Sequence, residues 1–318
     1  MKKISAFVAA HIWVWSLLLT VVLIIILSFI SVGGFSMQSL LLNLTIMSFF
    51  VILGMGQMVV ITSGNGAIDL SIPNNLGLAS YICCALTFSE NGIMLPLWLA
   101  ILITIVFLCL IGLLNGIITV YLRIPAIVTT LAVSYMVYTA LLIMMPRVIG
   151  TPDATLTAFT RLRFAGVSVL TVFAFLVAAF FAFLIYKTRY GVNLRAMGQG
   201  HQIARLSGIN INKTLIITFV ISALCSAVGG ILIGAYNGGA YVQMGDYYHL
   251  PTIASVVLGG TLISGGRCSV IGVIFGALML TILGSLMTVS GLSYGTQQLI
   301  QGFVLVGMLI FSISGKKA

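Results

Sequence analysis

Few side chains in this sequence can do chemistry, and their spacing does not build a catalytic centre. Among 318 residues there are three histidines and four acidic residues. His11, His201 and His249 are separated by long apolar stretches, so they lack the spacing of a metal-binding or acid–base motif. The sequence contains no H-E-x-x-H zinc motif, no G-x-S-x-G nucleophile turn and no P-loop. These observations argue against a membrane-embedded enzyme, and we expect this chain to bind no metal ion or cofactor.

Two acidic residues lie in polar segments that interrupt apolar runs. Asp69 lies in SGNGAIDLSIPNNLG, residues 63–77, and Asp246 lies in GAYNGGAYVQMGDYYHLP, residues 234–251. Lipid cannot hydrogen-bond a peptide group, so irregular backbone at membrane depth must be buried in protein or line a wet cavity. Corresponding interruptions in two halves of a chain are typical of an inverted repeat around a transport path. We therefore assign to the translocation path the polar residues Asp69, Ser71, Asn74, Asp246 and His249.

Both segments also have simpler interpretations. An acidic residue at the end of a span often accepts backbone N–H bonds as the N-cap of the next helix, and we favour this role for Asp69. Tyr241, Tyr247 and Tyr248 could line a vestibule for a solute, but the interfacial belt of a membrane protein explains such aromatic residues better. The five cysteines lie in or beside apolar runs without a C-x-x-C pair, which favours a packing role.

The elements that must position these residues are membrane-spanning helices. The chain is 61% hydrophobic and only 6% charged, whereas a soluble domain is about half apolar and about a quarter charged. Apolar runs of about 20 residues, which suffice to cross a bilayer, recur along its whole length. The sequence predicts an all-α integral membrane protein with one transmembrane domain, residues 1–318. The ten predicted spans are 13–31, 41–62, 70–88, 94–120, 126–145, 166–186, 214–236, 251–264, 270–289 and 297–313.

The basic residues indicate how these spans are oriented. The net charge of +10 comes from loops without a basic, aromatic-interleaved face, so it does not indicate nucleic-acid binding. With the N-terminus inside, eleven of the fourteen Lys and Arg residues face the cytoplasm. The positive-inside rule therefore places both termini in the cytoplasm and residues 146–165 and 237–250 outside. The eighth predicted span, 251–264, is short for a full crossing and could be re-entrant.

One polar stretch between spans is unusually rich in positive charge. KTRYGVNLRAMGQGHQIARLSGININK, residues 187–213, contains five basic residues, no acid and four glycines. Within it we expect a short helix that begins at Gln199 or Gly200 and ends at Gly208 in the left-handed conformation. His201, Ala204 and Arg205 fall within one and a half turns of that helix. Such a helix suits docking on a partner, although a basic loop that only fixes topology explains the charge equally well.

Small residues are dense in the last third of the chain. Gly272 and Gly276 have the G-x-x-x-G spacing that lets two membrane helices approach closely. We expect close helix packing there, either within the subunit or across a dimer.

Four blocks of sequence carry a resemblance to a known family. They are GAIDLSIP at 66–73, RIPAIVTTLA at 123–132, RAMGQGHQIARLSGI at 195–209 and IASVVLGGTLISGGRCSVIGVIFGALML at 253–280. The chain resembles the permease subunits of the ribose and simple-sugar branch of bacterial ATP-binding-cassette importers over nearly its whole length. The last two blocks together are the specific ones.

This resemblance implies partners and a role for the basic stretch. The third block looks like the coupling loop whose short helix sits in a cleft of the ATPase subunit. The residues assigned to it are Arg195, Gly198, Gln199, His201, Ala204, Arg205 and Gly208. The resemblance also implies a substrate-binding protein, a second permease subunit that is a copy or a paralogue, ATP bound by the ATPase rather than by this chain, and the bacterial inner membrane.

The implied substrate is a pentose, a hexose, a related polyol or a sugar-like signalling molecule. The main alternative is an ion-coupled secondary carrier of a small polar solute. Few acidic residues are buried in the spans, which disfavours a carrier built on an intramembrane carboxylate relay.

Overall fold

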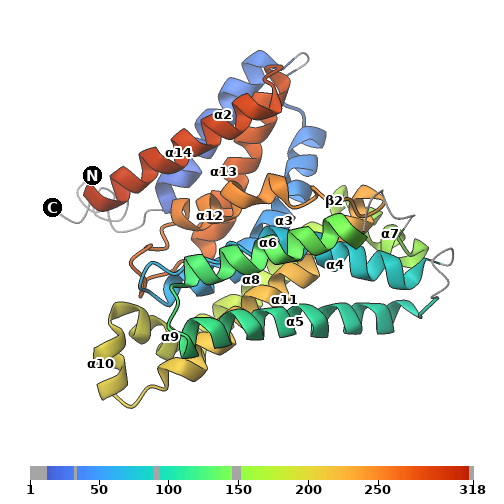
Figure 1. The fold of residues 1–318 in the computed structure, drawn as a ribbon. Helices are drawn as coiled ribbons and strands as arrows, with labels where there is room; N and C mark the ends of the chain where they lie inside the picture. Colours follow the sequence, from blue (N-terminus) through green and yellow to red (C-terminus); the bar gives the residue numbers. More distant parts are fainter. Residues whose placement is uncertain (1–12, 32–33, 89–93, 145–151, 315–318) are drawn as a thin grey trace.

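The computed structural model describes residues 13–31, 34–88, 94–144 and 152–314, and this part of the chain is mostly helical (Figure 1). The helices are α2 (Trp13–Ile30), α3 (Met37–Thr62), α4 (Ile72–Thr87), α5 (Leu97–Tyr121), α6 (Ala126–Met144), α7 (Ala154–Arg161), α8 (Val169–Lys187), α9 (Arg189–Gln199), α10 (His201–Leu206), α11 (Ile211–Asn237), α12 (His249–Leu258), α13 (Val270–Val289) and α14 (Tyr294–Ser314). A 3-10 turn, η2 (Asp246–Tyr248), precedes α12, and β1 (Arg163–Phe164) pairs with β2 (Val167–Ser168) as an antiparallel hairpin.

Seven of the described helices, α2, α3, α5, α6, α8, α11 and α13, are long and apolar enough to cross a membrane. The prediction of a mostly helical, multi-pass membrane protein is therefore confirmed. Two of the predicted spans form shorter helices, because α4 has 16 residues and α12 has only 10. At 1.5 Å per residue α12 reaches about 15 Å, half the thickness of a hydrocarbon core. The count of ten spans stays a prediction.

Helix α3 forms the centre of the fold. Its most apolar window is 89% buried, and it packs against α8, α11, α12 and α13. Over this window the residues of α3 itself are apolar on every side of the helix, which is typical of a buried helix. Gly56 allows α11 to approach, because a Cβ at this position would lie 3.2 Å from the Ser222 carbonyl oxygen. Helices α4, α5, α6 and α11 pack together on one side of α3, and α13 joins α2 to its other side (Figure 1).

The G-x-x-x-G pair brings α13 against α12. A Cβ at Gly272 would overlap the carbonyl oxygen of Gly259, and one at Gly276 would overlap that of Ser255. The predicted close packing is confirmed, and it lies within the subunit.

Loops gather at two opposite ends of the molecule (Figure 1). One end carries α9 and α10, and the other carries α7 and the hairpin. The sequence did not predict α7. Its N-cap is Asp153, whose carboxylate accepts the N–H groups of Thr155 and Leu156 at 2.8 and 3.2 Å. The predicted start of a span at residue 166 is wrong by three positions, because residues 167–168 belong to the hairpin and α8 begins at Val169.

Candidate functional site

The basic stretch forms two consecutive helices. The expected short helix is α10, which follows Gly200 and is terminated by Gly208 at φ +81°. The sequence did not predict α9. Its N-cap is Thr188, whose hydroxyl accepts the N–H of Gly191 at 3.3 Å. Tyr190 fixes this start to α11, since its hydroxyl lies 2.9 Å from that of Thr218. Burial raises the pKa of Tyr190, so its hydroxyl stays neutral.

His201 attaches the start of α10 to the turn after α3. Its Nε2 lies 2.9 Å from the carbonyl oxygen of Ser63, which can only accept a hydrogen bond. Nε2 therefore carries the proton, and Nδ1 accepts a bond of 3.1 Å from the side-chain amide of Asn65. Both ring nitrogens therefore connect the start of α10 to the turn after α3.

Four glycines connect three segments that are far apart in the sequence. We call Gly64, Gly198, Gly265 and Gly266 the glycine joint. A Cβ at Gly198 would overlap the Thr62 carbonyl oxygen and the Gly266 nitrogen, and one at Gly64 would lie 2.9 Å from the Gly198 Cα. The Gly266 N–H donates a 3.0 Å hydrogen bond to the Thr62 carbonyl. The end of α9 is thus in backbone contact with the end of α3 and with the loop after α12.

Asp69 stabilises the first interruption, residues 63–77, through three hydrogen bonds. Its Oδ1 accepts bonds from the Ser71 N–H at 2.9 Å and the Ser71 hydroxyl at 2.6 Å. Its Oδ2 accepts a 2.6 Å bond from the hydroxyl of Ser222 in α11. The N-cap interpretation of Asp69 is wrong, because Ser71 occupies the N-cap position of α4. The carboxylate instead closes a local turn and ties it to α11.

The polar network continues from Ser71 into neighbouring helices. The side-chain amides of Asn75 and Asn115 each donate a 3.0 Å bond to the Ser71 hydroxyl, which links α4 to α5. Asn74 links α4 to α6, because its amide donates to the Ser134 hydroxyl at 2.8 Å. The interrupted segment is therefore held on three sides.

The two interruptions meet inside the molecule. A Cβ at Gly245, just before η2, would overlap the carbonyl oxygen of Pro73 in the first turn of α4. The tyrosines beside this contact pack inward, since the rings of Tyr247 and Tyr248 lie 5.7 and 5.3 Å from the ring of Phe50. The interfacial-belt interpretation is therefore wrong for these two residues, whereas Tyr241 is 42% exposed.

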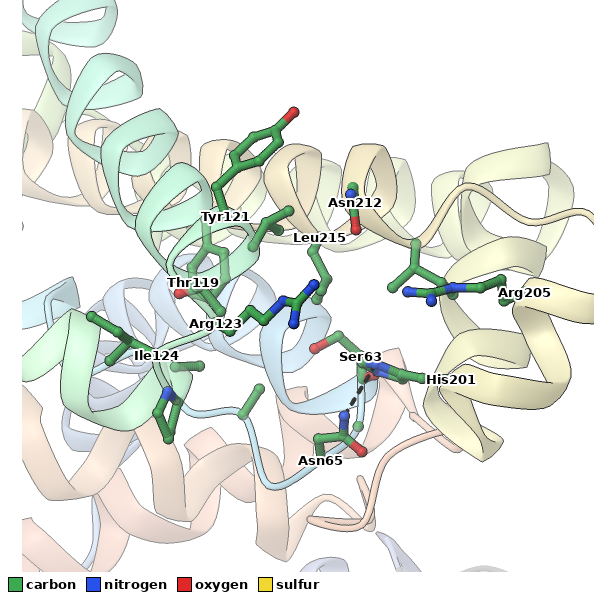
Figure 2. Close-up of a pocket in the computed structure, with 17 residues that line it drawn as sticks. Ser63, Asn65, Thr119, Tyr121, Arg123, Ile124, His201, Arg205, Asn212 and Leu215 are labelled. Carbon is green, nitrogen blue, oxygen red and sulfur yellow. Dashed lines mark hydrogen bonds between the residues drawn. The ribbon is translucent and has the colours of Figure 1, made fainter.

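A pocket of about 590 Å³ opens beside α10 at the end that carries the glycine joint (Figure 2). The end of α5, the start of α6, the turn after α3, α10 and the start of α11 form its walls. Arg123 and Arg205 contribute the basic groups, and Ala67 and Phe219 lie among its apolar lining residues.

Residues 39–313 match the family described as branched-chain amino acid transport system / permease component. The chain belongs to this permease family. Its membership identifies the protein as a component of a membrane transport system rather than an enzyme. The described residues contain no group of His, Cys, Asp or Glu side chains placed to hold a metal ion.

The permease is similar to named importers. It is 31% identical over 264 residues to the galactose/methyl galactoside import permease protein MglC of Escherichia coli (strain K12). The aligned region covers 78% of this chain and 77% of MglC. It is 28% identical over 256 residues to the autoinducer 2 import system permease protein LsrD of Salmonella typhi, which covers 77% and 75% of the two chains. No solved structure matches the permease.

The residues predicted for ATPase coupling divide into two groups in the permease. In the first group, Gly198 and Ala204 are buried and His201 is half-buried, so these residues hold the two helices in place. In the second group, Gln199 and Arg205 are exposed, and the guanidinium of Arg195 lies 5.6 Å from the centre of the Tyr186 ring. The sequence interpretation missed Ile203 and Leu206, which are 72% and 89% exposed. Two large apolar residues three positions apart in a polar segment were the available signal. They form an apolar face at the end of the molecule.

The residues predicted for the translocation path also divide. Asp69, Ser71 and Asn74 are buried, with at most 6% of each exposed, so they do not face an open path in this structure. Asp246 and His249 are half-buried at the second interruption. The structure brings the two segments together, while the role of their side chains in transport stays a prediction.

Proposed function

We propose that this permease is the transmembrane subunit of an ATP-binding-cassette importer for a simple sugar or a sugar-like solute. The named relatives, which import galactose and autoinducer 2, support this class of solute over the amino acids in the family description. A binding protein delivers the solute, and a separate ATPase subunit binds and hydrolyses ATP, so this chain binds no cofactor. The path forms between this chain, as a single transmembrane domain of residues 1–318, and a second permease that is a copy or a paralogue.

We further propose that the α9–α10 end faces the cytoplasm in the bacterial inner membrane, with ten spans and both chain termini inside. Basic residues at this end, Arg195, Arg205 and Lys213 among them, support the orientation. The basic termini, with Lys2, Lys3, Lys316 and Lys317, lie outside the described residues.

The two short helices support the proposal of an inverted repeat. The turn before α4 starts from the glycine joint, and α4 runs toward α7, where Cys83 packs with Leu156. The turn before α12 starts from the opposite end, and α12 leads back to the loop that holds Gly265. Two short helices that begin at a shared contact and run in opposite directions are typical of such repeats.

The glycine joint carries the coupling mechanism. No flexible side chain lies between the contacting backbone segments of the glycine joint. A displacement of α9 would therefore move the end of α3 and the loop after α12 together. These two segments lead to the Asp69 turn and to α12, which lie on either side of the contact between Gly245 and Pro73. ATPase movement at α10 would then reach both interruptions and alternate the access of the path.

The apolar face of α10 allows a test of whether this helix contacts the ATPase subunit. We expect the double variant Ile203→Ser, Leu206→Ser to lose co-purification with the ATPase, because each buried aliphatic side chain contributes about 1.5–3 kcal/mol and each 1.4 kcal/mol changes affinity about tenfold. Co-purification and stimulation of ATP hydrolysis by loaded binding protein are measured together.

Phe164→Ser is the matched control, since Phe164 is as exposed as Ile203, at 72%, but lies at the opposite end. Complete retention of the ATPase complex and of its stimulation by the α10 variant would mean that the basic stretch only fixes topology.

The energy source is tested separately. Import into vesicles should need ATP and persist when ionophores dissipate ion gradients. Collapse of import with the gradients would instead support the secondary carrier.

Topology is tested by labelling single cysteines in a cysteine-free background. Gln199 and Thr155 are exposed at opposite ends of the molecule. In intact cells with a permeabilised outer membrane, an impermeant thiol reagent should label Thr155→Cys and leave Gln199→Cys unlabelled until the inner membrane is broken. Equal labelling of both positions before breakage would contradict the orientation.

A further inference from the structure

Two arginines face each other across the pocket beside α10. Figure 2 shows the guanidinium groups of Arg123 and Arg205 directed into the pocket from opposite walls. No acidic residue is among the described residues that line it. A guanidinium group is always charged in a protein, so two of them pointing at one space repel each other unless an anion lies between them.

The backbone holds one of these arginines in an unusual conformation. Arg123 follows the end of α5 and has φ +56°, in the left-handed region that few residues other than glycine adopt. Such strain persists only where surrounding structure imposes it, and it concentrates at functional sites. The first residues of α6 and α11, Ala126 and Ile211, also line the pocket, and the positive ends of these helix dipoles add to its potential.

The pocket continues into a groove with a different character. A second hollow of about 350 Å³ shares Tyr121 and Asn212 with the first and is lined by Lys213, Ile216 and Ile217. Tyr121 is 66% exposed and Ile217 is 36% exposed, on helices that cross the membrane. The combined groove is therefore cationic at the end of α10, and it gains an apolar wall from Tyr121, Ile216 and Ile217 on α5 and α11, beside the polar Asn210, Asn212 and Lys213.

We propose that this groove binds an anionic phospholipid, with its phosphate between Arg123 and Arg205 and an acyl chain along α5 and α11. Basic pockets between membrane helices on the cytoplasmic side suit anionic headgroups. A soluble anion would leave the apolar wall unused, and so would a carboxylate of the ATPase. A bound phosphate would tie α10 to the α5–α6 corner and stabilise the coupling segment.

The test uses the full-length permease, delipidated in detergent. Phosphatidylglycerol and phosphatidylcholine with identical acyl chains are titrated, and bound lipid is measured by native mass spectrometry together with thermal stability. We expect phosphatidylglycerol to bind about thirtyfold more weakly to Arg123→Gln, Arg205→Gln, since each of the two arginines near a headgroup contributes about 1 kcal/mol. Phosphatidylcholine binding should not change.

Arg161→Gln, Arg163→Gln is the matched control, because both arginines are exposed at the opposite end, and it should bind phosphatidylglycerol like the wild type. Arg205→Gln alone leaves the strained position intact and should show part of the loss even if the double variant does not fold. Equal binding of the two lipids by the wild type would overturn the proposal. So would displacement of phosphatidylglycerol by inorganic phosphate at equal concentration, which indicates a soluble-anion site. Loss of the ATPase complex with normal lipid binding in Arg205→Gln would assign the pocket to the ATPase.

Discussion

Gly198→Ala is expected to abolish transport, although alanine is the better helix former. At an ordinary helical position this change stabilises by about 0.5–1 kcal/mol. At Gly198 the added Cβ would overlap the Thr62 carbonyl oxygen and the Gly266 nitrogen. Neither atom belongs to a side chain that can rotate away, so we expect a cost of about 3 kcal/mol, the upper end for overpacking. Thermal stability in detergent and solute import should both fall.

Gly200→Ala is the matched control two residues away. The φ of Gly200 is 173°, an extended conformation open to any residue, and its Cβ would meet nothing closer than an Ile203 side-chain atom at 3.5 Å. Alanine is a poor N-cap, so we expect a loss of at most about 1 kcal/mol and nearly normal import. Similar behaviour of the two variants would refute the glycine joint as a rigid connection.

Asp69→Ala should be the most damaging single change in the first interruption. It leaves the Ser71 N–H, the Ser71 hydroxyl and the Ser222 hydroxyl without their acceptor in a buried site. Each unsatisfied buried group costs about 1–3 kcal/mol, so the sum is several kcal/mol. Asp69→Asn keeps an oxygen toward Ser71, and its amide can donate to Ser222. Asparagine should therefore restore much of the import and of the folded protein in the membrane.

Asp153→Ala provides the comparison with an acid that only caps a helix. Its carboxylate accepts two N–H groups at the exposed start of α7, so its loss should cost about 1 kcal/mol and leave import nearly intact. If Asp69→Asn is as damaging as Asp69→Ala while both reach the membrane in normal amounts, the negative charge itself is required.

The long apolar helices and the short helix α10 were predictable because they depend on local sequence. Apolar length determines which segments cross a bilayer, and the Gly200 and Gly208 positions bound α10 as expected. The half-length of α12 was also foreseeable from its short apolar run, 251–264. These features need no knowledge of which segments meet in the folded chain.

The contacts of the site were not predictable, because they depend on tertiary packing. The position of Asp69 near a helix start indicated an N-cap, but its partner Ser222 is 153 residues away. Gly198 could be assigned to the coupling loop, whereas its contact with Gly266 gave no local signal. Tyr248 looked interfacial because a buried turn and a surface loop can have similar composition. Exposure of Leu206 likewise becomes visible only when α10 is placed at the end of the molecule.

The burial of α3 has a consequence for biogenesis. This helix is the second described one in the chain, yet α11, α12 and α13, which cover it, are synthesised more than 140 residues later. Until they insert, Gln57, which is completely buried in the final fold, has no such cover. A polar amide in contact with lipid is unfavourable. The insertion machinery must therefore shield the newly inserted N-terminal part of the chain from lipid until the C-terminal half is inserted. Truncation before α11 should make this part a substrate for membrane proteases.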